Sequence, residues 1–159
     1  MPTIKAFRMD GLGNKFVIVD RRKDFVNITK KKIIHLGNLK SFHRDIGFDQ
    51  IIFIEKEVGK AFPITIFNAD GNEVSACGNG SRCIAYLLGK DLNTKEVKLK
   101  TNNRLLNAKI LGDFDVELAM GKPIFEWDKI PLSKNLDHSN ITLNIENKKF
   151  PDGFCVNVG

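Results

Sequence analysis

A cysteine followed at once by glycine and asparagine is the arrangement in this sequence best suited to chemistry. Cys77 stands directly before Gly78-Asn79-Gly80, and a helical pattern continues from there to Leu88. The first amide groups of a helix have no intrahelical acceptors and lie at the positive end of its dipole. Both effects stabilise a thiolate at Cys77, and the same N–H groups can bind a carboxylate. The segment therefore predicts a proton-transfer group beside an anion-binding site.

Phosphate-binding motifs do not account for these glycines. The Gly-x-x-x-x-Gly-Lys-Ser/Thr motif is absent, and the dinucleotide fingerprint fails because Cys83 stands where its third glycine is needed. The pair Gly11 and Gly13 fails in the same way at Phe16. The residues leave one alternative open, in which Cys77 is a buried cysteine at a tight turn.

The cysteines indicate free thiols in a reducing compartment. Cys77, Cys83 and Cys155 are an odd number and too few for a disulfide scaffold. The first two are not spaced as a Cys-x-x-Cys zinc ligand pair, and the three histidines are scattered. We therefore expect no metal site, and we expect Cys83 and Cys155 to be core residues.

Composition indicates a globular protein of one domain or slightly more. The 159 residues are 42% hydrophobic and 28% charged, and no apolar run approaches the length of a membrane-spanning helix. The net charge of +6 is compatible with nucleic-acid binding, but the basic clusters 21–23 and 30–32 lack interleaved aromatics and no nucleic-acid motif is present. The start lacks a secretory signal. We expect a cytoplasmic protein that binds neither membrane nor nucleic acid.

Strands and helices must position these residues. Patterns of β-branched and alternating apolar residues predict strands over 4–9, 16–20, 51–54, 64–67, 96–101, 105–111 and 114–120. One helix is expected from Thr29 to a stop at 37–38, and another from Gly78 to Leu88 with Gly89 as its stop. After a break at 121–123, strands are expected over 141–145 and 154–158. The predicted class is α+β, with one domain over 1–120 and the incomplete beginning of a second over 121–159.

Four segments together resemble the diaminopimelate epimerases, in order and at family-like spacing. They are Met9-Asp10-Gly11-Leu12-Gly13-Asn14-Lys15-Phe16, Gly47-Phe48-Asp49-Gln50, residues 68–83 and Val156-Asn157-Val158-Gly159. The third contains Asn-Ala-Asp-Gly-x-Glu and Ala-Cys-Gly-Asn-Gly-x-Arg-Cys, which are specific to the family. The resemblance implies a mixed or antiparallel sheet wrapped around a central helix.

The resemblance also implies an activity, the conversion of LL- to meso-diaminopimelate without a cofactor. One thiolate removes the α-proton while a thiol on the opposite face delivers another, and Cys77 matches the first of these two cysteines. Five residues match substrate-binding positions: Asn14, Gln50, Asn68, Gly78 and Asn79. Lys15 departs from the family, which usually has an acidic residue there.

Three of these residues also have a purely structural explanation. Asn14 can supply a left-handed turn residue, Gln50 can cap a strand edge, and Asn68 can form an Asx-turn.

The resemblance implies that this chain carries only one half of an active site. Enzymes of the family have two similar domains, each contributing one cysteine at a helix start. Here the second Ala-Cys-Gly-Thr/Ser-Gly motif is absent, and the chain stops where the family continues with Asn-Pro-His. We expect the isolated chain to be inactive and to need a separate carboxy-terminal half or a second copy as partner. The alternatives are another cofactor-independent amino-acid racemase of the same fold, and a catalytically dead remnant or interaction module.

Overall fold

The computed structural model describes residues 5–41, 44–45, 47–145 and 148–158. The chain forms two compact units, Met1–Ala119 and Met120–Gly159. Ile4, in the expected first strand, and Gly159, in the last matched segment, lie outside the described residues. Among the residues described, no helix is long and apolar enough to cross a membrane.

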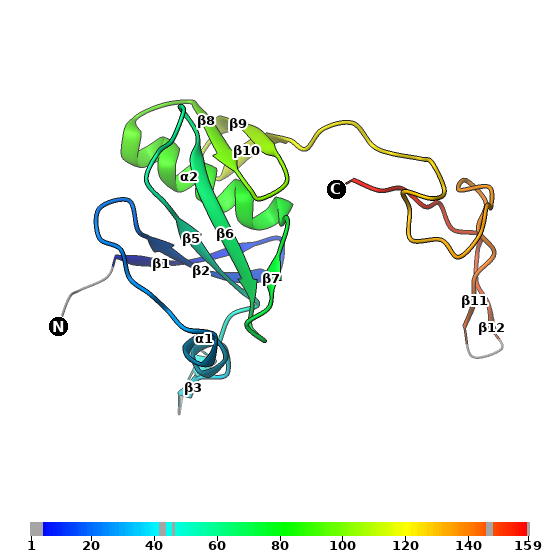
Figure 1. Ribbon diagram of the computed structural model, residues 1–159, viewed down its shortest axis with the longest axis horizontal. Helices are drawn as coiled ribbons and strands as arrows, with labels where there is room; N and C mark the ends of the chain where they lie inside the picture. Colours follow the sequence, from blue (N-terminus) through cyan, green and yellow to red (C-terminus); the bar gives the residue numbers. More distant parts are fainter. Residues whose placement is uncertain (1–4, 42–43, 46, 146–147, 159) are drawn as a thin grey trace. The chain divides into compact units, whose positions relative to one another are not determined.

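The first unit is built on a mixed eight-stranded sheet, drawn in blue to yellow-green in Figure 1. The strand order is β1-β2-β5-β6-β8-β9-β10, with β7 paired to β6. Pairs β2–β5 and β6–β8 are parallel, and the others are antiparallel. The strands are β1 (Ala6–Gly11), β2 (Asn14–Asp20), β5 (Gln50–Ile54), β6 (Phe62–Asn68), β7 (Glu73–Val74), β8 (Glu96–Lys100), β9 (Leu105–Gly112) and β10 (Asp115–Ala119). The expected α+β class with a mixed sheet is confirmed.

The two faces of this sheet carry separate cores. Successive side chains of a strand point to opposite faces, so Ile52 and Ile54 of β5 join the larger core cluster, while Ile51 and Phe53 join a smaller one. All four side chains are buried. The apolar run 51–54 is therefore a strand covered on both sides, as its unbroken pattern predicts.

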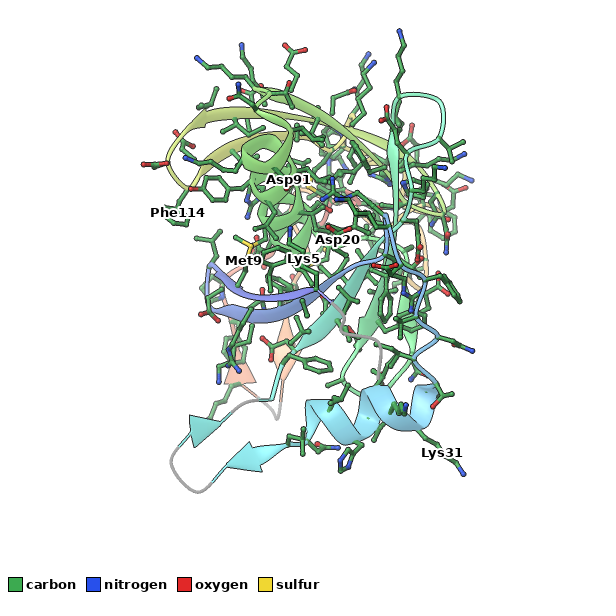
Figure 2. All side chains as sticks on the ribbon, turned by 90° about the vertical axis from the view of Figure 1, so that its left-hand side faces the viewer. Lys5, Met9, Asp20, Lys31, Asp91 and Phe114 are labelled. Atoms are coloured by element: carbon green, nitrogen blue, oxygen red, sulfur yellow. The ribbon has the colours of Figure 1, made fainter. Side chains whose placement is uncertain are left out.

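Helix α2 (Gly78–Leu92) covers the first face. Its residues Ile84, Ala85 and Leu88 are buried in the larger cluster, and the helix contacts β1, β2, β8, β9 and β10. Figure 2 shows Met9 of β1 between that strand and the helix, where its side chain packs against the larger cluster.

The expected stop of this helix at Gly89 is wrong. The helix continues to Leu92 and ends where Asn93 adopts the left-handed conformation, with φ 50° and ψ 49°. Gly89 is instead buried against the side chain of Ile110. Asparagine tolerates the left-handed region better than most residues, so Asn93 supplies the stop.

Helix α1 (Lys30–Gly37) covers the second face and starts at the expected cap. The Oγ1 atom of Thr29 accepts the N–H of Lys32 at 3.4 Å, and the cap at the other end is Asn38. Ile33 is buried in the smaller cluster with Phe48. The helix is followed by a short hairpin, β3 (Lys40–Ser41) and β4 (Arg44–Asp45).

The second unit has little regular structure among its described residues. It holds one short hairpin, β11 (Asn144–Ile145) and β12 (Lys148–Lys149), and isolated bridges Ile124–Asn157 and Ile141–Gly153. The strand expected over 141–145 is therefore limited to its last two residues, and the one expected over 154–158 to a bridge at Asn157. An alternating pattern forms a strand only where another strand accepts its hydrogen bonds.

Candidate active site

Cys77 is the N-cap of helix α2. Its backbone is extended, with φ −150° and ψ 106°, and its Sγ atom accepts the N–H of Gly80 at 3.4 Å. The residue is half-buried, and it packs against the larger core cluster. The N–H groups of Gly78 and Asn79 follow at a position where a helix offers no internal acceptor. A partly exposed thiol thus lies where the amide donors of α2 converge.

Two glycines let the start of this helix approach the sheet. A Cβ atom at Gly80 would lie 2.6 Å from Cδ1 of Ile52 and 3.3 Å from Cε1 of Phe16. A Cβ atom at Gly11, the last residue of β1, would lie 3.1 Å from Sγ of Cys83 and 3.4 Å from the carbonyl oxygen of Asn79. A side chain at Gly80 would therefore require Ile52 to shift, and one at Gly11 would crowd Phe16, Cys83 and the backbone of Asn79.

Strand register brings the predicted polar residues to one end of the sheet. Phe16 of β2 pairs with Gln50 of β5, and Gln50 pairs with Asn68 of β6. Asn14 is the first residue of β2. Because Gly80 also lies against Phe16, the start of α2 lies over this same end. The structure thus brings all six predicted site residues to one region of the first unit.

Asn14 and Asn79 are directly hydrogen-bonded. The Nδ2 atom of Asn79 donates to Oδ1 of Asn14 at 2.9 Å, and Nδ2 of Asn14 donates to Oδ2 of Asp49 at 3.4 Å. The same carboxylate oxygen accepts the N–H of Lys15 at 2.8 Å, and Nη2 of Arg82 donates to Oδ1 of Asn79. Asn14 therefore does more than fill a turn, because its side chain links the β1–β2 hairpin to helix α2.

Gln50 and Asn68 form a second amide pair. Nε2 of Gln50 donates to Oδ1 of Asn68 at 2.9 Å. The turn after Asn68 is closed by its backbone carbonyl, which accepts the N–H of Gly71 at 2.8 Å, whereas its side-chain oxygen accepts from Gln50. The Oε1 atom of Gln50 is buried and has no hydrogen-bond partner among the described residues, so it can accept a hydrogen bond from a ligand.

The other two cysteines differ from Cys77. Cys83 is buried at 7% exposure, as expected, and burial raises the pKa of its thiol, which stays protonated at neutral pH. The expectation that Cys155 is a core residue is wrong, because it is half-buried. The second unit does not form the strand that would have covered it.

A cavity of about 250 Å³ lies beside the start of α2. Its lining includes Leu12, Asn79, Cys83, Tyr86 and Phe114. Asn79 is the only predicted site residue among those that line it, and Cys77 is not among them. The cavity therefore adjoins the predicted site at Asn79.

Two residues near the site were not singled out from the sequence, Asp49 and Arg82. Both lie within the matched segments, and Arg82 is three residues after Asn79, a spacing that brings helical side chains together. That spacing could have indicated the contact. No group of His, Cys, Asp or Glu side chains in the described part of the chain is arranged to hold a metal ion.

Comparison with known proteins gives the same assignment. A family model described as diaminopimelate epimerase matches residues 6–126. The diaminopimelate epimerase of Pelagibacter ubique is 45% identical over 98% of this chain, which covers 57% of that protein. The one from Acidiphilium cryptum is 38% identical over 86% of the chain and 48% of its own length. The chain thus spans about half the length of these relatives.

Solved structures show the same fold at low identity. A predicted epimerase from Pseudomonas aeruginosa is 16% identical, with a TM-score of 0.58 over 78% of this chain and 45% of that one. A phenazine biosynthesis PhzC/PhzF protein from Clostridium difficile is 17% identical, with a TM-score of 0.53 over 69% of this chain and 41% of that one. With the family model covering most of the first unit and the relatives matching nearly the whole chain, this chain belongs to the diaminopimelate epimerase family.

Proposed function

We propose that this chain supplies one half of a diaminopimelate epimerase site, with Cys77 as one of its two acid–base groups. The observation that carries the proposal is the position of Cys77, which caps α2 as a partly exposed thiol. Two amide pairs, Asn14–Asn79 and Gln50–Asn68, lie at the same end of the sheet. A proton-transfer group and substrate-binding amides therefore occur together, which an inert structural cysteine does not require.

The proposed reaction inverts the α-carbon by two proton transfers. The thiolate of Cys77 removes the α-proton and becomes a thiol, and the electron pair of the C–H bond remains on the α-carbon and its carboxylate. A thiol on the opposite face then donates its proton to that carbon and becomes a thiolate. The two sulfurs exchange protonation states, so the step consumes no cofactor. The α-proton is a very weak acid, and donors directed at the carboxylate are needed to stabilise the carbanion.

Substrate binding is proposed for the five polar positions. The N–H groups of Gly78 and Asn79 would bind the α-carboxylate at the positive end of α2. The side chains of Asn14, Gln50 and Asn68 would bind the polar ends of diaminopimelate. The unpartnered Oε1 of Gln50 suits an ammonium donor, because an ammonium group can only donate hydrogen bonds.

The second acid–base group is proposed to come from another polypeptide region. Neither Cys83 nor Cys155 precedes a Gly-x-Gly segment, and Cys83 is buried. A separate carboxy-terminal half would bring a second cysteine motif, and a second copy of this chain would bring a second Cys77. We propose that the assembled protein is a cytoplasmic enzyme of amino-acid biosynthesis, the route to lysine.

The proposal extends to the family architecture around the site. In this architecture, the sheet wraps around α2 as a central helix. Residues 1–120 form the amino-terminal domain, and residues 121–159 begin a second domain. In support, α2 contacts both β1 and β10, which stand at opposite ends of the strand order. Strands so far apart in one sheet can reach one helix only where the sheet curves around it.

Isotope exchange in D2O tests the function. We expect the isolated chain to leave LL-diaminopimelate unchanged, and we expect epimerisation when it is mixed with the carboxy-terminal half of the Pelagibacter relative. Cys77→Ala should reduce that activity by at least about a thousandfold, while Cys155→Ser should retain it. Activity of the mixture without Cys77 would contradict the proposal.

The same assay separates the alternatives. Turnover of a different amino acid from a panel would identify another racemase of this fold. Epimerisation by the isolated chain, accompanied by a concentration-dependent dimer mass, would favour a second copy as the partner. No turnover under any condition would favour a remnant or interaction module.

A further inference from the structure

We propose that Asp49 and Arg82 are positioning residues that fix the orientation of the Asn14 and Asn79 side-chain amides. The inference rests on the proposed function and deepens it, because it assigns roles to two residues that the motif match left unassigned. Four side chains form an ordered series, Arg82–Asn79–Asn14–Asp49. They come from helix α2, the β1–β2 hairpin and the residue preceding β5.

The ends of this series determine the direction of every hydrogen bond in it. A guanidinium can only donate and an ionised carboxylate can only accept. Arg82 therefore requires the oxygen of Asn79, whose nitrogen must then face Asn14. The nitrogen of Asn79 requires the oxygen of Asn14, whose nitrogen must face Asp49. An amide side chain by itself can be turned by 180° at little steric cost, so the two charged ends select one of its two orientations.

The selected orientation leaves one N–H group of each amide available for a ligand. Each amide nitrogen carries two N–H groups, and each uses one within the series, so Asn14 and Asn79 keep one N–H apiece. Asn79 also lies at the start of α2, where the helix dipole favours negative charge. The pair therefore matches an anionic acceptor such as a carboxylate.

Asp49 also holds the backbone of the elements that carry the amides. Its carboxylate accepts the N–H of Lys15 at 2.8 Å, directly after Asn14. Its own N–H donates to the carbonyl of Lys15 at 2.9 Å, and its carbonyl accepts the N–H of Ala69 at 3.0 Å, directly after Asn68. Asp49 thus links the hairpin, β5 and the turn after β6. Its side chain can orient Asn14, while its backbone fixes the distance between these three segments.

Substitutions of nearly equal size separate orientation from structure. Asp49→Asn keeps the shape but removes the acceptor-only end, and Arg82→Gln removes the donor-only end. Arg82→Lys and Asp49→Glu keep those ends and serve as rescue variants. Asp24→Asn, at an exposed position, is the matched control for a change of charge.

Two readouts are taken on the full 159-residue chain labelled with nitrogen-15. The first is the side-chain amide spectrum of Asn14 and Asn79, with the backbone amide spectrum as the check on folding. The second is titration with diaminopimelate, followed by the same side-chain signals. We expect Asp49→Asn and Arg82→Gln to shift both amide pairs and to weaken binding about tenfold, as for the loss of a charged hydrogen bond. Arg82→Lys, Asp49→Glu and Asp24→Asn should stay within about twofold of the wild type.

The outcomes keep this inference separate from the proposed function. If the wild-type chain does not bind diaminopimelate, substrate binding by this half fails, and the amide spectra alone decide the inference. If Asp49→Asn and Arg82→Gln leave the Asn14 and Asn79 signals in place, the inference is overturned even if diaminopimelate binds. Equal losses for Arg82→Lys and Arg82→Gln would also overturn it, because Lys keeps the donor-only end.

Discussion

The two units of this chain bury their apolar residues to very different extents. The first unit has a core cluster on each face of its sheet, and side chains such as Ile18, Ile52 and Ile84 have 0% exposure. In the described part of the second unit, two side chains are buried, Ile130 at 5% and Ile141 at 9% exposure. Nine other large apolar side chains of its described part are exposed: Ile124, Phe125, Trp127, Leu136, Leu143, Phe150, Phe154, Val156 and Val158.

The difference shows what a strand needs besides its pattern. In the first unit each main strand has a neighbour that accepts its hydrogen bonds, as β8 has in β9 over five residue pairs. In the second unit the described pairing is limited to two-residue strands and isolated bridges. Burial and strand pairing therefore go together, because a sheet buries apolar surface only where several strands form one face.

Separate expression of the two units should give the largest difference. We expect residues 1–119 to unfold cooperatively, because both core clusters lie within them. We expect residues 120–159 alone to give the spectrum of an unfolded chain, because the two buried side chains among its described residues cannot offset the entropy of ordering this piece. Circular dichroism with urea titration measures both. A cooperative transition in the shorter piece would remove the distinction between the units.

Matched Ile→Ala substitutions should give the second-largest difference between the two units. Ile52→Ala in the first unit should lower the free energy of unfolding by about 3 kcal/mol, because it leaves a cavity between the sheet and α2. Ile130→Ala in the second unit should cost about 1 kcal/mol or less, because sparse surroundings can collapse into the space. Urea denaturation of the full chain measures each loss, and equal losses would contradict the comparison.

The cysteines that the sequence assigned to the core should react at different rates. Cys83 is buried in the first unit and burial raises the pKa of its thiol, whereas Cys155 is half-buried. We expect iodoacetamide at pH 7 to alkylate Cys155 at least about a hundredfold faster than Cys83, because Cys83 becomes accessible only when the core unfolds locally. Mass spectrometry of a Cys77→Ser background measures both rates. In urea, where the chain is unfolded, the alkylation rates of Cys83 and Cys155 should become similar.

Ion pairs should give the smallest difference. Arg22 binds the Asp20 carboxylate through two nitrogens, at 2.9 and 2.7 Å, and the hydrogen bond lowers the pKa of Asp20 from its ordinary value of 3.8. Asp20→Asn should therefore lower stability at pH 7 by about 1.5 kcal/mol. The pair Lys129–Asp128 in the second unit is exposed and 3.7 Å apart, so Asp128→Asn should have almost no effect.

The pH dependence of the Asp20 effect has a defined sign. Because the pKa of Asp20 is lowered in the folded chain, its contribution is fully present above the ordinary pKa of 3.8 and is lost as pH falls through the lower, folded value. The stability difference between wild type and Asp20→Asn should therefore shrink below about pH 4. A difference that grew toward acid would contradict the assignment of this ion pair.

Much of the first unit followed from its sequence. The cap at Thr29, the start of α2 after Cys77 and the strand at 51–54 are as predicted, because each depends on residues close together in the chain. The end of α2 was not predicted correctly from the sequence. Gly89 is the usual kind of stop, but packing against Ile110 keeps it within the helix, and Asn93 ends the helix instead.

In the second unit, similar sequence patterns predicted the structure less well. Residues 141–145 alternate as clearly as 96–101, yet only β8 forms a full strand. Cys155 has an apolar pattern around it but lies half-exposed. Alternation predicts which face of a strand can be buried, and it does not supply the neighbouring strands that bury it.

By itself, the sequence determined the local chemistry of this protein: a cysteine at a helix start, glycines that allow close approach, and motifs that place the chain in its family. Only the tertiary structure decided that Asn79 donates to Asn14, 65 residues away, and that Asn14 donates to Asp49, 35 residues away. A cap or a turn is set by neighbours in the chain, whereas the partners of a side-chain amide are set by strand register and helix packing. The orientation of the site's amides is therefore a property of the fold.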